Sequence, residues 1–174
     1  MVGGNPAQNT LIIQQSRDSS EPIMYNEKVL DHYRNPRNIG EIQDADGLGI
    51  YVSESCGDIT KFWIKVKENR IVDAKFKTQG CAASIASGSM LTEIVIGKTL
   101  EEAQKITKDN VVSALGGLPE FKIHCSLLAT DALKDAIYDC LRKRDLPVPN
   151  DLQKKHEEIE SQIEKLKTMG YIMI

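Results

Sequence analysis

The sequence predicts a domain in which one short helix precedes an antiparallel β-sheet and several helices follow it, with an extra helix near the C-terminal end. Residues 59–67 and 70–78 alternate apolar and charged side chains, as strands of a half-buried antiparallel sheet do. After residue 80 the apolar spacing changes to that of helices. Strands and helices are therefore expected in separate parts of the chain.

The first ordered element is expected near Tyr25. A flexible leader over residues 1–23, rich in Asn, Gln, Ser, Gly and Pro, precedes it. Asn26 can cap a helix whose apolar face contains Val29, Leu30 and Tyr33. Pro36 ends this helix, and the turn-forming residues 35–40 follow it.

Three strands are expected next, over residues 49–55, 59–67 and 70–78. The second strand has Phe62, Ile64 and Val66 on one face, and the third has Val72, Ala74 and Phe76. Residues 68–69 form a tight turn between them.

The helical part begins over residues 82–96, where many small side chains allow close packing. Thr99 and Glu102 match a capping box that opens a short helix. Asp109 or Asn110 starts another, which ends at Gly116-Gly117.

A loop over residues 118–122 leads to a long helix over residues 124–144, which Pro147 breaks. A charged helix over residues 151–168 closes the chain. Its apolar seam consists of Leu152, His156, Ile159, Ile163 and Leu166.

The composition excludes several classes of protein. With 174 residues, 41% hydrophobic and 27% charged, the chain is typical of a soluble globular domain with extensions. A net charge of −3 predicts no nucleic-acid partner, and no apolar run approaches the roughly 20 residues that span a bilayer. The first fifteen residues lack a secretory signal, so four reduced cysteines in a cytoplasmic protein are expected.

Three cysteines lie on separate predicted elements, each near a possible co-ligand or at a helix start. Cys56 is two residues before Asp58, Cys81 begins a helix, and Cys125 follows His124. Thiolate, imidazole and carboxylate together suit zinc or iron, and thiolates bind iron–sulfur clusters. Three thiolates are one short of a four-cysteine site, which favours transfer of a metal over its storage.

Each motif also has a purely structural interpretation. Cys56 and Cys81 could be small packing residues, and Asp58 could be a turn former. The His124-Cys125 pair could be a solvated imidazole beside a core thiol. A helix N-terminus stabilises a thiolate. This effect supports the functional interpretation of Cys81 and Cys125, since each is expected to begin a helix.

Cys140 provides an internal control. It lies fifteen residues beyond Cys125 on one predicted helix. At about 1.5 Å per residue the two are roughly 22 Å apart and cannot share a metal. We interpret Cys140 as a packing residue, and His32 and His156 as structural or solvated. Lys122 is a loop lysine whose charge could favour a thiolate or pair with a carboxylate.

Several stretches carry motifs in a fixed order: residues 25–33, 35–40, 56–58, 77–87, 97–100, 114–119 and 124–126. Together they resemble the IscU/NifU-type iron–sulfur cluster assembly scaffold family. The resemblance covers about residues 24–143. It implies an α+β fold, with a three-stranded antiparallel sheet covered by helices. We therefore expect a scaffold domain over residues 24–145 and a C-terminal helical extension over residues 146–174.

The resemblance also implies a function. Proteins of this family receive sulfur from a cysteine desulfurase, combine it with iron and pass a [2Fe-2S] cluster to apo-proteins, as scaffolds and carriers rather than enzymes. By position, the cluster cysteines match Cys56, Cys81 and Cys125, and the last of these also matches the persulfide acceptor. The acidic residue associated with cluster lability, the accessory ligand and the nearby lysine match Asp58, His124 and Lys122.

The family's chaperone-binding loop often reads Leu-Pro-Pro-Val-Lys, whereas residues 118–122 read Leu-Pro-Glu-Phe-Lys, which leaves a chaperone partner open. Zinc-binding sulfur acceptors typically carry an insertion before the third cysteine. The compact stretch over residues 97–122 favours the scaffold over such a zinc-bound relay.

Two further alternatives concern how the thiols are used. If one subunit supplies only three thiolates, a homodimer could share a cluster. A thiol enzyme with Cys125 as nucleophile and His124 as base is a weaker alternative. Neighbours on a helix diverge by about 100°, which makes direct proton transfer awkward.

Overall fold

The computed structural model describes residues 25–171, and the leader expected over residues 1–23 lies outside that range. Its strands are β1 (Gly47–Val52), β2 (Ile59–Lys67) and β3 (Arg70–Gln79). Its helices are α1 (Glu27–Arg34), α2 (Ala82–Val95), α3 (Leu100–Gln104), α4 (Lys108–Ala114), α5 (His124–Lys143) and α6 (Asn150–Thr168). A 3₁₀ turn, Glu120–Lys122, precedes α5.

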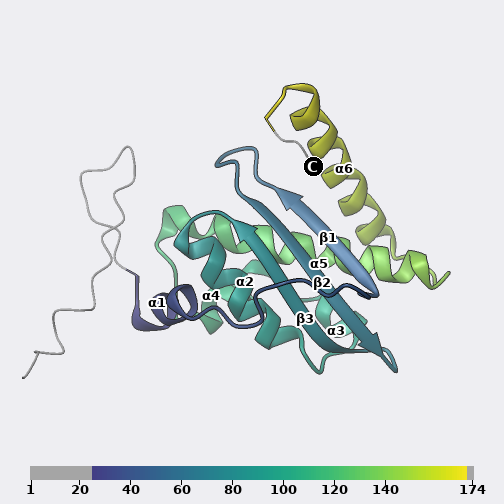
Figure 1. Ribbon diagram of the computed structural model, residues 1–174, viewed down its shortest axis with the longest axis horizontal. Coiled ribbons are helices and arrows are strands. Elements are labelled where there is room, and N and C mark those ends of the chain that lie inside the picture. The colour runs from purple at the N-terminus through teal and green to yellow at the C-terminus, as the bar shows by residue number, and fades with distance from the viewer. Residues whose placement is uncertain (1–24, 172–174) are drawn as a thin grey trace, which may run out of the picture.

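The three strands form one antiparallel sheet in the order β1-β2-β3. Helices α2 and α5 cover one face of it, with α2 against β3 and α5 against β1 and β2 (Figure 1). The core between them contains Phe62, Ile64, Phe76, Leu91, Leu133 and Ile137. The predicted α+β class with a three-stranded antiparallel sheet is confirmed.

The strand prediction was accurate for β2 and β3 and less so for β1. Instead of extending to residue 55, β1 ends at Val52. The chain then turns, since the N–H of Ser53 donates to the carbonyl of Asp58 at 2.8 Å and the N–H of Gly57 donates to that of Ser53 at 2.9 Å. These hydrogen bonds close the turn that carries Cys56.

Asn26 begins α1, as its sequence position predicts. Its side-chain oxygen accepts a hydrogen bond from the N–H of Val29 at 2.9 Å. Its side-chain nitrogen donates to the carbonyl oxygens of Leu115 and Gly117 at 3.0 and 3.1 Å. One residue therefore caps α1 and ties it to the turn that leads towards α5.

The capping box of Thr99 and Glu102 opens α3 as predicted. The predicted start of α4 at Asp109 or Asn110 was slightly wrong, because Thr107 is its N-cap and Asn110 reciprocates at the third helical position. A reciprocal pair with Asn in place of Glu or Gln is easily missed in a sequence.

Helix α5 lies directly against β1. A Cβ added at Gly49 would overlap the carbonyl oxygen of Ala132, so glycine is needed for this approach. The outer N–H groups of β1 are also paired with α5: Leu48 donates to Asp139 at 2.8 Å and Ile50 to Asp135 at 2.9 Å. Two carboxylates thus occupy donors that an open sheet edge would expose.

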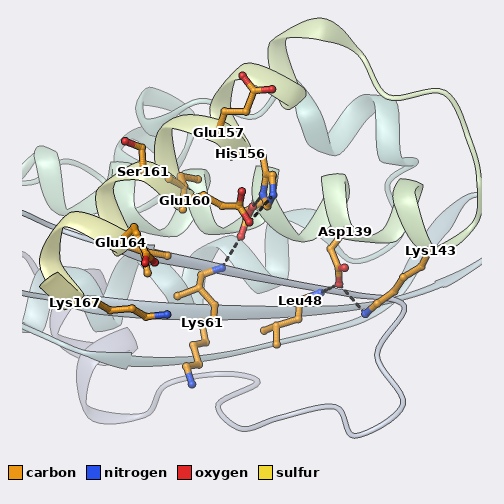
Figure 2. Close-up of a pocket in the computed structure, with 14 residues that line it drawn as sticks. Leu48, Lys61, Asp139, Lys143, His156, Glu157, Glu160, Ser161, Glu164 and Lys167 are labelled. Carbon is orange, nitrogen blue, oxygen red and sulfur yellow. Dashed lines mark hydrogen bonds and ion pairs between the residues drawn. The ribbon is translucent and has the colours of Figure 1, made fainter. Parts of the chain in front are cut away.

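Helix α6 packs along α5 and β1 (Figure 1). Of its predicted seam, Leu152, Ile159 and Leu166 are buried. His156 Nδ1 lies 2.7 Å from Asp135 Oδ1, and its ring stacks on Tyr138 with centroids 3.9 Å apart. Figure 2 shows His156 at the groove between α6 and the sheet. Its contacts are those of a structural residue.

No helix within residues 25–171 combines the length and apolar character needed to cross a bilayer.

Candidate metal centre

Asp58, Cys81 and Cys125 converge although they come from distant parts of the chain. Asp58 ends the turn before β2, Cys81 is the N-cap of α2, and Cys125 lies in the first turn of α5. One ligand atom from each lies within 4.8 Å of the others, and the two sulfurs are 3.5 Å apart. Two thiols and a carboxylate fit iron or zinc.

Neighbouring backbone and side chains hold Asp58 in this position. Its Oδ2 accepts hydrogen bonds from Ser84 Oγ at 2.7 Å and from the N–H of Cys81 at 3.3 Å. Gly80 leaves the necessary room, because a Cβ there would overlap the Asp58 carboxylate. Sequence reasoning missed Ser84, although a serine three residues after a helix N-cap faces the same end of the helix.

The two thiols are not equivalent. A hydrogen bond from the Cys125 thiol lowers the pKa of Cys81 well below its usual range, and Ser84 and Lys122 contribute to the same shift. The same hydrogen bond, together with burial, raises the pKa of Cys125. Both cysteines begin helices and both were expected to favour the thiolate. Two adjacent thiolates would repel each other, which opposes loss of both protons, and the two pKa values shift in opposite directions.

Lys122 lies close enough to the pair for its charge to lower the pKa of both thiols. Among residues 25–171 it forms no ion pair with Asp58, which was the other role considered for it. The charge of Lys122 therefore acts on the pKa of the two thiols and not on the Asp58 carboxylate.

Cys56 lies outside the group of Asp58, Cys81 and Cys125. It is exposed on the turn after β1, with its Sγ 3.1 Å from Ser53 Oγ. Cys140 is buried at the opposite end of α5, where its Cβ faces Gly47 of β1. The structure thus gathers two of the four cysteines and leaves Cys56 on a neighbouring loop.

His124 is exposed, and its Nε2 lies 3.6 Å from Cys125 Sγ. This contact differs from the expectation that neighbours on a helix diverge too far for proton transfer. His124 is the first residue of α5, and its imidazole turns towards the thiol that follows it. It can exchange a proton with the Cys125 thiol.

The pKa of Tyr25 is also shifted. Its ring is buried in the core cluster that includes Cys125. Burial raises the pKa of its hydroxyl, and the charges of Cys81 and Cys125 raise it further. Nothing in the local sequence separates this tyrosine from an ordinary core residue.

A separate groove of about 900 Å³ lies between α6 and the outer part of β1. Leu48, Ile50, Ile159 and Ile163 supply its apolar surface, and charged residues of α5 and α6 surround it (Figure 2). None of the cysteines lines it. The chemistry of the thiols is therefore remote from this groove.

The asymmetry of the two thiols gives a measurable expectation. In Cys125→Ala the main hydrogen bond to Cys81 is lost, so the pKa of Cys81 rises towards the usual thiol value of about 8.5. Lys122→Ala should raise it by a smaller amount. The rate of Cys81 alkylation as a function of pH, followed by peptide mapping, measures both shifts, and alkylation of Cys56 in the same samples is the control. An unchanged Cys81 profile in Cys125→Ala would contradict the assigned hydrogen bond.

The family model described as "NifU-like N terminal domain" matches residues 24–146. An iron–sulfur cluster assembly scaffold protein IscU of Archaeoglobus fulgidus is 60% identical over 120 residues, covering 69% of this chain and 78% of that protein. The IscU scaffold protein of Escherichia coli K12 is 50% identical over 127 residues, covering 71% and 98%.

Among solved structures, a protein of Fervidobacterium islandicum superposes with a TM-score of 0.54 at 25% identity, covering 65% of this chain and 96% of that one. It is described as a candidate scaffold for iron–sulfur cluster assembly in the SUF system. The family model ends before α6, so that helix lies outside the shared region.

Proposed function

Because the chain belongs to the family of NifU-like N-terminal domains, we propose that it is a scaffold for the assembly of [2Fe-2S] clusters from iron and desulfurase-derived sulfur. The completed cluster then passes to apo-proteins. The observation that carries this proposal is the convergence of Asp58, Cys81 and Cys125 within 4.8 Å. The names of the IscU relatives support the same role.

Such a site is proposed to bind iron weakly enough for the metal to be transferred. Cys81 and Cys125 supply thiolates, and Asp58 supplies an oxygen, which is a harder and more readily exchanged ligand. Cys56 and His124 lie on adjoining segments and are the proposed additional ligands when the cluster forms. An incomplete thiolate set keeps the cluster transferable, whether it is bound by one subunit or shared by two.

Cys125 is the proposed sulfur acceptor. His124 can take the proton of the Cys125 thiol across the 3.6 Å contact. The resulting thiolate attacks the terminal sulfur of the desulfurase persulfide, and the desulfurase thiolate leaves with the electron pair of the broken S–S bond. Sulfur is transferred without a net change in the number of electrons. The partners are therefore a cysteine desulfurase and recipient apo-proteins.

Anaerobic reconstitution tests the function. The protein is incubated with iron, cysteine, a cysteine desulfurase and dithiothreitol, whose thiols reduce sulfane sulfur to sulfide, and we expect the visible absorption of a [2Fe-2S] cluster. Folded protein that shows no such absorption would reject the scaffold function. Stoichiometric zinc that iron and sulfide cannot displace would instead favour the zinc-bound sulfur relay.

Replacement of Asp58 by alanine is expected to slow release of the cluster to an apo-protein. The expected factor is roughly tenfold, which is the size of effect that changes around metal sites typically have. The reason is that an oxygen ligand or proton acceptor is lost. Asp58→Asn is the matched control for fold, because an amide oxygen can still accept the hydrogen bonds from Ser84 and Cys81. Transfer kinetics to an apo-ferredoxin measure the effect, and equal rates in Asp58→Ala and the parent would count against it.

A further inference from the structure

Helix α6 contacts the turn that carries Cys56. Gln162 Nε2 donates a hydrogen bond to the carbonyl oxygen of Val52, the last residue of β1, at 2.7 Å. Three residues further along α6, Lys165 Nζ lies 3.4 Å from an oxygen of Glu54, which belongs to the turn itself. Figure 1 shows α6 running along β1, which leads into this turn. The C-terminal half of α6 therefore restrains the turn at two points.

The two polar contacts are not backed by close packing. A cavity of about 480 Å³ lies between the turn and the end of α6. Val52, Leu166 and Met169 supply apolar surface to it, and Gly57 lines it from the turn. Dense packing is what usually fixes one segment against another. The position of this turn against α6 therefore depends chiefly on the hydrogen bond and the ion pair.

Helix α6 is attached to the rest of the domain without help from the turn. Leu152 and Ile159 are buried where α6 meets α5 and β1. His156 Nδ1 lies 2.7 Å from Asp135 Oδ1 of α5. Removal of the two side chains that reach the turn leaves these contacts intact. The helix is therefore a fixed support, and the turn is the part that can move.

Only Gly57 separates Cys56 from the metal centre. Asp58, on the other side of Gly57, belongs to the group with Cys81 and Cys125, whereas Cys56 does not. Two residues of chain span at most about 7 Å. Gly57 has a φ of +71°, and no atom lies within 4 Å of a Cβ built there. A glycine in open space can change its backbone angles at little cost, so rotation at Gly57 can carry Cys56 towards the other two thiols.

We propose that Gln162 and Lys165 are positioning residues that hold the turn so that Cys56 stays away from the other two thiols, and that α6 thereby limits how often Cys56 becomes a metal ligand. An exposed ion pair contributes little, so the hydrogen bond of Gln162 is the stronger restraint. The inference rests on the proposed function and adds to it control of the ligand number by a helix outside the family model.

The restraint has a direct thermodynamic consequence. Cys56 binds metal only in the fraction of molecules in which the turn has moved, and the apparent affinity is reduced by that fraction. A site that usually offers two thiolates and a carboxylate releases its metal more readily than one with three thiolates. Loss of the restraint should therefore tighten metal binding.

The test compares Gln162→Ala/Lys165→Ala with the matched pair Gln153→Ala/Lys154→Ala. The control also removes one amide and one ammonium group from α6, where Gln153 bonds within the helix and Lys154 is exposed. Each pair is made in the parent and in Cys56→Ser. The full-length proteins are titrated with Co²⁺ in the absence of oxygen, and the sulfur-to-cobalt charge-transfer absorption reports how many thiolates bind.

We expect Gln162→Ala/Lys165→Ala to bind Co²⁺ roughly fivefold more tightly than the parent, the size of effect of one net hydrogen bond. Its charge-transfer band should also be stronger, because a third thiolate binds. In Cys56→Ser the same two substitutions should change neither quantity, since no third thiol is available. The control pair should behave as the parent does.

A second measurement needs no metal. The N–H of Gly57 donates to the carbonyl of Ser53 and is freed when the turn moves. Hydrogen exchange of this amide should be roughly fivefold faster in Gln162→Ala/Lys165→Ala than in the parent or in the control pair.

Unchanged or weaker Co²⁺ binding by Gln162→Ala/Lys165→Ala would overturn this inference, as would an equal gain in Cys56→Ser or unchanged exchange at Gly57. The scaffold function would still stand, because it depends on cluster assembly by the parent. A parent that binds Co²⁺ but assembles no cluster would reject the scaffold function, while the cobalt titrations would still decide the role of α6. A parent that binds no Co²⁺ through its thiols would overturn both.

Discussion

Replacing Cys81 with serine is expected to lower the Co²⁺ or Fe²⁺ affinity of the site by at least about 100-fold, beyond the 10–100-fold typical of outer-shell changes, and to prevent cluster assembly. The pKa of Cys81 is lowered by its hydrogen bond with Cys125, and the two sulfurs lie 3.5 Å apart. Serine supplies a neutral hydroxyl at the same position, which is a poor ligand for iron. Cobalt titration measures the affinity, and anaerobic reconstitution measures assembly.

The fold should survive this change. Serine is a favourable N-cap, and the N–H of residue 81 can still donate to Asp58. Cys140→Ser is the matched control, since it removes a thiol that is buried against β1 at the other end of α5. It should retain full cobalt binding. Parental affinity in Cys81→Ser, or loss of binding in folded Cys140→Ser, would show that the metal does not bind where the three ligands converge.

Replacing Gly49 with alanine is expected to destabilise the protein by about 3 kcal/mol or more. The added methyl group would overlap the backbone of Ala132 and Ala136 in α5, and backbone atoms cannot move aside as a flexible side chain can. The strand must therefore move away from α5, which weakens the Leu48–Asp139 and Ile50–Asp135 hydrogen bonds. Thermal unfolding should show a melting temperature lower by roughly 6–12 °C.

Gly97→Ala is the control that distinguishes the steric clash at Gly49 from the cost of replacing any glycine. Nothing lies within 4 Å of a Cβ at Gly97, but its φ of +90° makes alanine unfavourable, at a cost of about 1–2 kcal/mol. Gly49→Ala should be clearly the more destabilised of the two. A Gly49→Ala protein as stable as the parent would mean that α5 and β1 do not approach as closely as described.

Much of the fold could be predicted from local patterns. The alternation in residues 59–67 predicted β2 with its observed bounds, and the Thr99–Glu102 pair predicted the start of α3. The end of β1 could not be predicted, because the turn of residues 53–58 depends on hydrogen bonds between backbone groups four and five residues apart. The second capping box was missed for a different reason, because Asn110 stands where such boxes usually have Glu or Gln.

The site was predictable in its residue types and not in its geometry. The chemistry of cysteine, aspartate and histidine pointed to a metal, and the order of the motifs pointed to a family that the family model and the relatives then confirmed. The ligand roles of all five residues, Cys56, Asp58, Cys81, His124 and Cys125, remain predictions. No pattern indicated that the sulfurs of Cys81 and Cys125 would lie 3.5 Å apart.

The sequence by itself determined which segments become strands and helices and which residue types are available to bind iron, because periodicity, capping and side-chain chemistry act over a few neighbouring residues. Only the tertiary structure decided that Asp58, Cys81 and Cys125 meet while Cys56 stays on an exposed turn, and that the pKa values of Cys81 and Cys125 shift in opposite directions. Those outcomes depend on how closely α2, α5 and the turn before β2 pack. That packing is determined by side chains that are distant from one another in the chain.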